Sequence, residues 1–190
     1  MEYLRKKMVD KATQIVIAGF GGQGIVLTGN IIARACVMED KHVAGMVSYG
    51  VEMRGGTANA TVVISDSEIA SPFVSKPDVA IILNQPSLDK FESQIAENGT
   101  VILNSSMITR DVERKDLDVV HVEAAKIAQW LGNARVANVV ALGAFIAKTG
   151  ILKTRSIDKS IEQLFAKKKA ALITINKKAL LEGIKAVSNQ

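Results

Sequence analysis

The sequence predicts an α/β fold in three layers, in which a mostly parallel β-sheet lies between helices and the C-terminal part is helical. Two observations favour this fold. Short β-branched runs recur along the chain, beginning with Gln14-Ile15-Val16-Ile17-Ala18, and such runs are typical of strands that are buried on both faces. Segments with apolar residues at helical spacing separate the runs. Strands that alternate with helices in this way form largely parallel sheets.

The individual elements are expected in a regular order. A helix over residues 24–39 follows the first strand. Further strands are expected at residues 42–47, 57–65, 78–83, 100–103 and 118–122, and helical spacing recurs at 87–96. Four more helices are expected in the last third, at residues 123–131, 137–148, 157–165 and 168–187. Gly150 and Ser156 are interpreted as the stop and start signals of two of these helices.

Length and composition bound the number of domains and the cofactors. A chain of 190 residues, 48% of them hydrophobic, is expected to form a single domain over residues 1–190, with its core at about 12–188. Cys36 is the single cysteine, so the chain lacks the thiolates that hold an iron–sulfur cluster or a structural zinc. Any such cofactor is therefore expected in another chain.

The net charge of +5 comes from 24 basic and 19 acidic residues, and much of the excess lies at residues 167–169 and 177–178. These lysines are interpreted as a solvated helix face. No nucleic-acid binding is expected, because aromatic residues that could stack on bases make up only 4% of the chain. An acidic ligand or partner surface remains the alternative. Neither a signal-peptide pattern nor an apolar span of membrane length is found, so a cytoplasmic protein without membrane contact is expected.

The sharpest motif is Gly19-Phe20-Gly21-Gly22-Gln23-Gly24, a G-x-G-x-x-G sequence between the first predicted strand and the first predicted helix. Glycines there let backbone amides approach an anion, and the helix N-terminus favours phosphate. The motif makes the domain Rossmann-like and gives five candidate ligand-binding residues: Gly19, Gly21, Gly22, Gln23 and Gly24. The alternative is that these glycines only permit close packing of strand and helix.

A dinucleotide-binding function would need an acidic residue at the end of the second strand, where it holds a ribose hydroxyl. That position falls at Val47 and Ser48, neither of which is acidic, and Asp40 and Glu52 lie off the expected strand end. A free-standing dinucleotide-binding protein therefore remains an alternative function and not the preferred one.

A second candidate site is the polar loop at residues 48–57. Arg54 could hold a carboxylate or phosphate with both arms of its guanidinium while Glu52 orients it. The alternative is that the two residues form an ion pair that fixes the loop. The candidate binding residues of this loop are Ser48, Tyr49, Glu52, Arg54, Gly55 and Gly56.

A third candidate site follows the strand expected at residues 78–83, at the strand end where ligands of open α/β sheets bind. Asn84 and Gln85 are its candidate residues. The alternative is a plain strand exit at which Ser87 caps the next helix. His42, His121 and Cys36 are interpreted as structural, and no catalytic residues are predicted.

Taken together, three motifs resemble the gamma subunit of 2-oxoacid:ferredoxin oxidoreductases. They are Gly-Phe-Gly-Gly-Gln-Gly at 19–24, Ser-Tyr-Gly-Val-Glu-Met-Arg-Gly-Gly-Thr-Ala-Asn at 48–59 and Asn-Gln-Pro-Ser at 84–87. The resemblance extends over about residues 12–188, through a Leu-Asn-Ser-Ser segment, to an Asn-x-x-Ala element at 176–179. One departure is Val51, where relatives commonly have proline.

The resemblance implies a complex that oxidatively decarboxylates a 2-oxoacid on thiamine diphosphate, reduces ferredoxin through iron–sulfur clusters and releases an acyl-coenzyme A. It places thiamine diphosphate and Mg²⁺ in alpha and beta subunits, and the clusters in beta and delta subunits. The gamma chain would bind no cofactor alone, would be inactive alone, and would help to bind or cap coenzyme A at the interface of the complex. The role is carried over to Gly21, Gly22, Gln23 and Gly24, and also to Arg54, Asn84 and Gln85.

The Glu-Met-Arg-Gly-Gly-Thr sequence at residues 52–57 is more similar to subunits of 2-oxoglutarate or branched-chain 2-oxoacid enzymes than to those of pyruvate enzymes. Either of the first two substrates is therefore expected for the complex. When it is isolated, the chain is expected to self-associate through the apolar face that its partners would cover. A purely structural scaffold subunit remains a further alternative.

Overall fold

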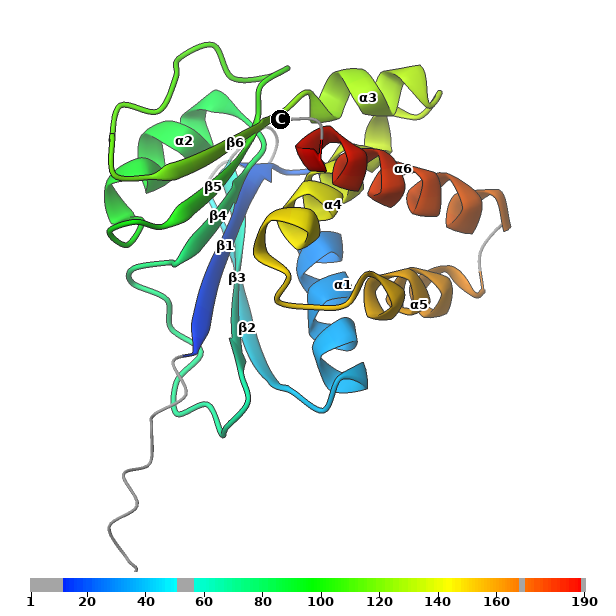
Figure 1. Cartoon of the computed structure of the whole chain (residues 1–190), viewed down its shortest axis with the longest axis horizontal. Coiled ribbons are helices and arrows are strands. Elements are labelled where there is room, and N and C mark those ends of the chain that lie inside the picture. The colour runs from blue at the N-terminus through cyan, green and yellow to red at the C-terminus, as the bar shows by residue number, and fades with distance from the viewer. Residues whose placement is uncertain (1–11, 51–56, 168–169, 189–190) are drawn as a thin grey trace, which may run out of the picture.

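The computed structural model describes residues 12–50, 57–167 and 170–188. Its centre is a six-stranded sheet in the order β2-β3-β1-β4-β5-β6 (Figure 1). The strands are β1 (Thr13–Phe20), β2 (His42–Tyr49), β3 (Thr57–Ser65), β4 (Val79–Ile82), β5 (Thr100–Asn104) and β6 (Asp118–Val122). The α/β architecture with a mostly parallel sheet is confirmed, and five of the six strands run in one direction.

The exception in direction is β3. It pairs antiparallel with β1 on one side and with β2 on the other. Strands β2 and β3 therefore form an antiparallel hairpin at one edge of the sheet, although β2 itself runs parallel to β1. The sheet is mixed at this edge because β3 lies between two strands of the opposite direction.

The helices lie on both faces of the sheet. They are α1 (Ile25–Met38), α2 (Gln85–Phe91), α3 (Ala124–Trp130), α4 (Ala137–Thr149), α5 (Thr154–Phe165) and α6 (Ala170–Ser188), with short 3₁₀ turns η1 (Glu92–Gln94) and η2 (Ala134–Val136). Figure 1 shows α1, α4, α5 and α6 on one side of the sheet and α2 on the other. Successive residues of β1 point to opposite faces, so Ile15 and Ile17 join the larger core while Val16 and Ala18 join the smaller one.

Two helix boundaries differ from expectation. Ser156 does not start α5, because the helix begins at Thr154 and Ser156 is buried in its first turn, with its N–H donating to the carbonyl of Lys153. Helix α2 begins at Gln85 and not at residue 87, since Asn84 is the N-cap and accepts from the N–H of Ser87 at 2.9 Å. The alternative in which Ser87 caps this helix is therefore wrong in its choice of the capping residue. Gly150 is confirmed as the stop of α4, with a φ of 60°.

Helices α4 and α6 cross at two glycines. A Cβ atom on Gly143 would overlap the carbonyl oxygen of Leu180, and one on Gly183 would overlap the carbonyl oxygen of Val140. The two backbones therefore touch where any other residue would hold them apart. The start of α4 lies beside the start of α1, where the Asn138 side chain donates to the carbonyl of Gly24. Within the described ranges, no helix has both the length and the apolar character needed to cross a bilayer.

Candidate functional site

The G-x-G-x-x-G motif forms the turn between β1 and α1, and its glycines fall into two pairs. A Cβ on Gly19 would lie 2.6 Å from the Gln23 side chain, and one on Gly24 would lie 2.5 Å from the Asn138 side chain. Gly21 and Gly22 are exposed, and a Cβ on either would meet nothing within 4 Å. The packing explanation therefore holds for the outer pair, whereas the inner pair leaves room for a ligand.

Gln23 and Asn84 lie together at this turn. The Gln23 Oε1 accepts from the N–H of Phe20 at 2.6 Å and from the Asn84 Nδ2 at 3.2 Å. Asn84 is buried, and its Oδ1 caps α2. The hydrogen bond between the Gln23 and Asn84 side chains thus joins the glycine turn to α2, the helix that follows β4. Both side chains are already engaged within the protein, so their first effect is to fix the shape of the turn.

The N-terminus of α1 faces this turn without a cap from any side chain, and no acidic residue lies in its first turn. The first amides of a helix have no partner within it, and they carry the positive end of the helix dipole. Asn138, at the start of α4, donates from its Nδ2 to the carbonyl of Gly24 at 3.1 Å and to the Thr28 hydroxyl at 3.0 Å. The start of α1 is therefore anchored to α4 while its amide end stays available to an anion.

A pocket of about 270 Å³ opens beside the turn, at the carboxyl ends of the parallel strands. Its walls come from the glycine turn, the ends of β4 and β5, and the segments around α3 and η2. The lining residues are Gly22, Gln23, Leu83, Asn104, Met107, Ala125, Ala134, Arg135 and Ala137. None of them is acidic, and Arg135 is the one charged residue among them. The pocket therefore favours an anionic ligand.

Sequence reasoning missed Asn104 and Arg135 as candidates. Asn104 is the last residue of β5, and Asn84 comes two residues after the end of β4; this repeated asparagine at a strand end was a signal that could have been used. It is buried, and it donates to the carbonyl of Leu83 and accepts from the N–H of Ala125, both at 3.2 Å. Arg135 lies in an aperiodic turn, where spacing gives no signal.

Gln85 was predicted as a binding residue, but the structure gives it a different position. Its Oε1 accepts from the N–H groups of Thr109 at 3.1 Å and Arg110 at 2.9 Å, and its Nε2 donates to Asp89 at 2.9 Å. It does not line the pocket beside the glycine turn. Gln85 instead holds the segment at residues 105–117, which covers the second face of the sheet.

Glu92 also binds the segment at residues 105–117, through its side-chain carboxylate. Its carboxylate accepts from the N–H of Glu113 at 2.5 Å, from the N–H of Arg114 at 2.9 Å and from the Arg110 guanidinium at 2.8 Å. Burial by itself would raise the pKa of Glu92, but the hydrogen bonds from Arg114, Arg110 and Glu113 together hold it below the usual value. This cluster has a structural role, because its charged groups form hydrogen bonds and ion pairs with one another.

The end of β2 and the start of β3 lie beside the glycine turn. Tyr49 pairs with Ala58, which in turn pairs with Gly19, and Thr57 pairs with Phe20. Ser48 and Tyr49 thus lie at the same edge of the sheet as the turn, although they do not line the pocket. The predicted residues Glu52, Arg54, Gly55 and Gly56 lie outside the described residues.

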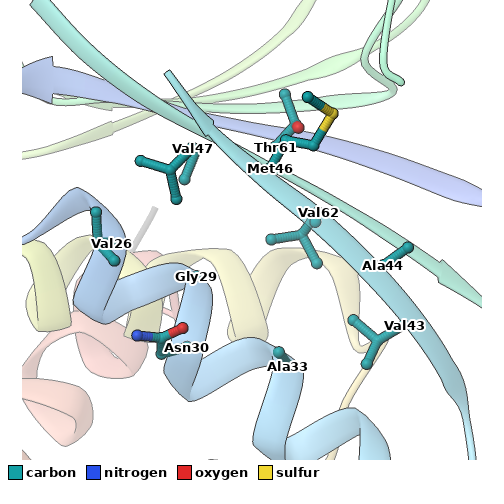
Figure 2. Close-up of a pocket in the computed structure, with 12 residues that line it drawn as sticks. Val26, Gly29, Asn30, Ala33, Val43, Ala44, Met46, Val47, Thr61 and Val62 are labelled. Carbon is teal, nitrogen blue, oxygen red and sulfur yellow. The ribbon is translucent and has the colours of Figure 1, made fainter. Parts of the chain in front are cut away.

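A second hollow, of about 200 Å³, lies between α1 and the β2–β3 hairpin (Figure 2). In Figure 2 the side chains of Val26 and Ala33 on α1 face those of Val43, Val47 and Val62 on the hairpin. Its walls carry no charged residue. The hollow is therefore suited to apolar contact and not to a phosphate.

Cys36 is buried on α1, where burial and the nearby Glu39 carboxylate raise the pKa of its thiol to about 12. A thiol that stays protonated at neutral pH is a poor nucleophile and a poor metal ligand. Among the described residues, no group of three or more His, Cys, Asp or Glu side chains could hold a metal ion. The structural interpretation of Cys36 agrees with this environment.

Comparison with known proteins gives one consistent family. Residues 14–186 match the family model described as "Pyruvate ferredoxin/flavodoxin oxidoreductase". The chain is 39% identical over 172 residues to the ketoisovalerate oxidoreductase subunit VorA of Methanothermobacter thermautotrophicus, a match that covers 90% of this chain and 35% of VorA. It is 37% identical over 161 residues to the 2-oxoglutarate synthase subunit KorC of Methanocaldococcus jannaschii, covering 83% of this chain and 86% of KorC.

The chain thus spans about a third of the length of VorA but most of the length of KorC. Among solved structures, the 2-oxoglutarate:ferredoxin oxidoreductase from Magnetococcus marinus, with 2-oxoglutarate, coenzyme A and succinyl-CoA bound, superposes with a TM-score of 0.86. The identity is 21%, over 95% of this chain and 32% of that chain. At this identity the likeness concerns the fold.

Proposed function

The chain belongs to the pyruvate ferredoxin/flavodoxin oxidoreductase family, and from this premise we propose that it is the gamma subunit of a 2-oxoacid:ferredoxin oxidoreductase complex. Within that complex its glycine turn binds a phosphate group of coenzyme A. Coenzyme A carries a diphosphate and a 3′-phosphate on its adenosine end, and either group suits an uncapped helix N-terminus. A protein of the same fold from Magnetococcus marinus has coenzyme A bound, which makes this the ligand to test.

The observation that carries the proposal is the open inner pair of glycines. Gly21 and Gly22 leave more than 4 Å of free space where side chains would stand, and they lie between an uncapped helix start and a pocket without acidic residues. Gly19 and Gly24, in contrast, are needed for packing inside the chain. The exposed part of the motif is therefore the part that a ligand can reach.

The size of the pocket supports a site that encloses only one end of coenzyme A. Pockets that enclose a whole drug-sized ligand measure roughly 300–1,000 Å³, whereas this one measures about 270 Å³. It has room for one end of coenzyme A, so the rest of the molecule lies against partner chains. The alpha, beta and delta subunits would supply that surface together with thiamine diphosphate, Mg²⁺ and the clusters. A cluster does not fit this chain, because its sequence has one cysteine.

A free-standing NAD-binding function is disfavoured by the sheet order. In a dinucleotide fold the strand after the first helix lies next to β1 and ends beside the ligand. Here antiparallel β3 lies in that place, and it starts at the ligand edge. The strand beside β1 therefore does not end at the position where an acidic residue would bind a ribose hydroxyl.

The substrate of the complex is proposed to be 2-oxoglutarate or a branched-chain 2-oxoacid. The relatives VorA and KorC are named for ketoisovalerate and 2-oxoglutarate. The role proposed for this chain is to bind coenzyme A and not the oxoacid, so the choice between the two substrates would belong to the partner subunits.

The test is a Gly21→Ala substitution in the reconstituted complex. Because a Cβ on Gly21 meets nothing in this chain and its φ is not positive, the variant will fold normally. The proposal predicts a KM for coenzyme A raised roughly tenfold with kcat little changed, since the methyl group occupies the place of the phosphate. Gly24→Ala is the comparison that affects folding, because its Cβ would clash with Asn138. An unchanged KM in the Gly21 variant would remove the turn from the ligand site.

A further inference from the structure

Arg135 has the position of a ligand-binding cation. Arg135 lines the pocket together with Gly22 and Gln23, and none of the described residues that line it carries a carboxylate. The side chain is exposed. Because a guanidinium stays protonated in proteins, Arg135 contributes a positive charge to the pocket beside the glycine turn.

The guanidinium of Arg135 has no hydrogen-bond or ion-pair partner among the described residues, whereas the backbone N–H of this residue donates to the Asn133 side chain. The contrast with two other arginines is direct. Arg110 binds Asp89, Glu92 and Glu113, and Arg114 binds Asp116. Those two arginines are used to hold the chain together, whereas Arg135 is available to a ligand.

The backbone under Arg135 is held in place. Its N–H donates to the Asn133 Oδ1 at 3.1 Å, and the N–H of Val136 donates to the Asn133 carbonyl at 3.1 Å. Val136 and Asn138, which follow directly, are buried. Asn138 is also the residue that anchors the start of α1. The turn that carries Arg135 and the glycine turn are therefore tied to the same side chain.

We infer that Arg135 binds a phosphate group of coenzyme A and, together with the open glycines, selects for the phosphate-bearing end of that molecule. A guanidinium can form two parallel hydrogen bonds to a phosphate, and backbone amides of the turn would bind further oxygens of the same end. This inference rests on the proposed function and adds to it a residue that determines specificity.

The experiment compares Arg135→Ala, Arg135→Lys and Gly21→Ala in the reconstituted complex. Arg135→Ala is expected to raise the KM for coenzyme A roughly tenfold to a hundredfold with kcat within about twofold. Arg135→Lys is expected to give a KM for coenzyme A between those of Arg135→Ala and the unchanged chain. Lysine keeps the positive charge but cannot form the two parallel hydrogen bonds of a guanidinium. Arg155→Ala is the matched control, since Arg155 is an exposed arginine in the first turn of α5, and α5 packs against the distant part of α1. It should leave the KM unchanged.

Competitive inhibitors identify the group that Arg135 binds. Adenosine 3′,5′-bisphosphate carries the 3′-phosphate, ADP carries the diphosphate, and pantetheine carries no phosphate. Arg135→Ala should weaken inhibition by at least one of the first two and leave inhibition by pantetheine as it was. The more strongly affected inhibitor shows which phosphate is bound.

Four results would overturn the inference. An unchanged KM in Arg135→Ala, alongside a raised KM in Gly21→Ala, would reject Arg135 but leave the proposed function standing. Unchanged KM values in both variants would reject both. A lower yield of assembled complex with an unchanged KM would assign Arg135 to an acidic surface of a partner chain. Equal weakening of all three inhibitors would also count against a phosphate contact.

Discussion

The Oε1 atom of Gln23 accepts a hydrogen bond from the Nδ2 atom of Asn84, 61 positions further along the chain, at 3.2 Å. This bond joins the glycine turn after β1 to the cap of the helix after β4. Because Gln23 also accepts from the N–H of Phe20, it holds the turn in the conformation that leaves Gly21 and Gly22 exposed. The proposed ligand site therefore depends on a contact between two of the three sequence motifs.

Removing this link should destabilise the chain. Asn84→Ala loses a helix cap and a buried hydrogen bond, and we expect the free energy of unfolding to fall by about 1–2 kcal/mol. Gln23→Ala should cost about 1 kcal/mol. Since the two side chains contact each other, denaturant unfolding of the double variant should show a coupling of roughly 0.5 kcal/mol or more. Strictly additive losses would mean that the contact contributes nothing.

The crossing of α4 and α6 predicts a large effect from one methyl group. Gly183→Ala should lower the free energy of unfolding by about 1–3 kcal/mol, because its Cβ would overlap the carbonyl oxygen of Val140. Gly29→Ala on α1 is the matched control, as a Cβ there has ordinary contact with Ala60 at 3.6 Å. Alanine favours helix by about 1 kcal/mol over glycine, so Gly29→Ala should be neutral or stabilising. If both variants behaved alike in thermal unfolding, the close crossing would be disproved.

The lowered pKa of Glu92 predicts a dependence of stability on pH. A carboxylate whose pKa is lower in the folded chain stabilises the fold fully above its unfolded pKa, near 4.5, and loses that effect as the pH falls through the lower, folded value. Glu92→Gln should therefore be less stable than the unchanged chain at pH 7, with a difference that shrinks below about pH 4.5. Unfolding in urea between pH 3 and 7 measures this difference.

Glu68→Gln is the control for that series, because Glu68 is exposed. It should follow the unchanged chain across the whole range. A Glu92→Gln variant whose loss of stability stayed constant from pH 7 to pH 3 would show that the charge of Glu92 does not fasten the 105–117 segment.

The open edge of β2 predicts self-association of the isolated chain. This strand pairs with β3 on one side, and Met46, Val47 and Tyr49 are exposed on it. Exposed apolar edge strands tend to pair with other chains. Light scattering of the chain alone should show species larger than a monomer, and Val47→Lys should reduce them. A clean monomer at high concentration would leave this expectation without support.

Much of the fold could be predicted because it follows from local patterns. β3 and β6 have the bounds that the apolar runs predicted, and α1 and α4 end within about one residue of expectation. Gly150 was predictable as a stop because glycine adopts the left-handed conformation without strain. The direction of β3 was not predictable, since an apolar run carries no information about which strand lies beside it.

The candidate site was predictable in part for a similar reason. The glycine turn and Asn84 come together because both follow strands whose carboxyl ends share one edge of the sheet. Gln85 is the neighbour of Asn84 in sequence but points to the 105–117 segment, and its direction depends on contacts that spacing does not encode. Arg135 joins the site through tertiary packing of α4 against α1, so no pattern in its own segment indicates it.

We propose that the exposed amides of the glycine turn bind a phosphate, and a structure of the assembled complex with coenzyme A bound would show this contact. We expect a phosphate oxygen within about 3.2 Å of the backbone nitrogen of Gly21 or Gly22, with the Arg135 guanidinium on the same end of the molecule. A turn packed against a partner chain, with every phosphate elsewhere, would contradict it.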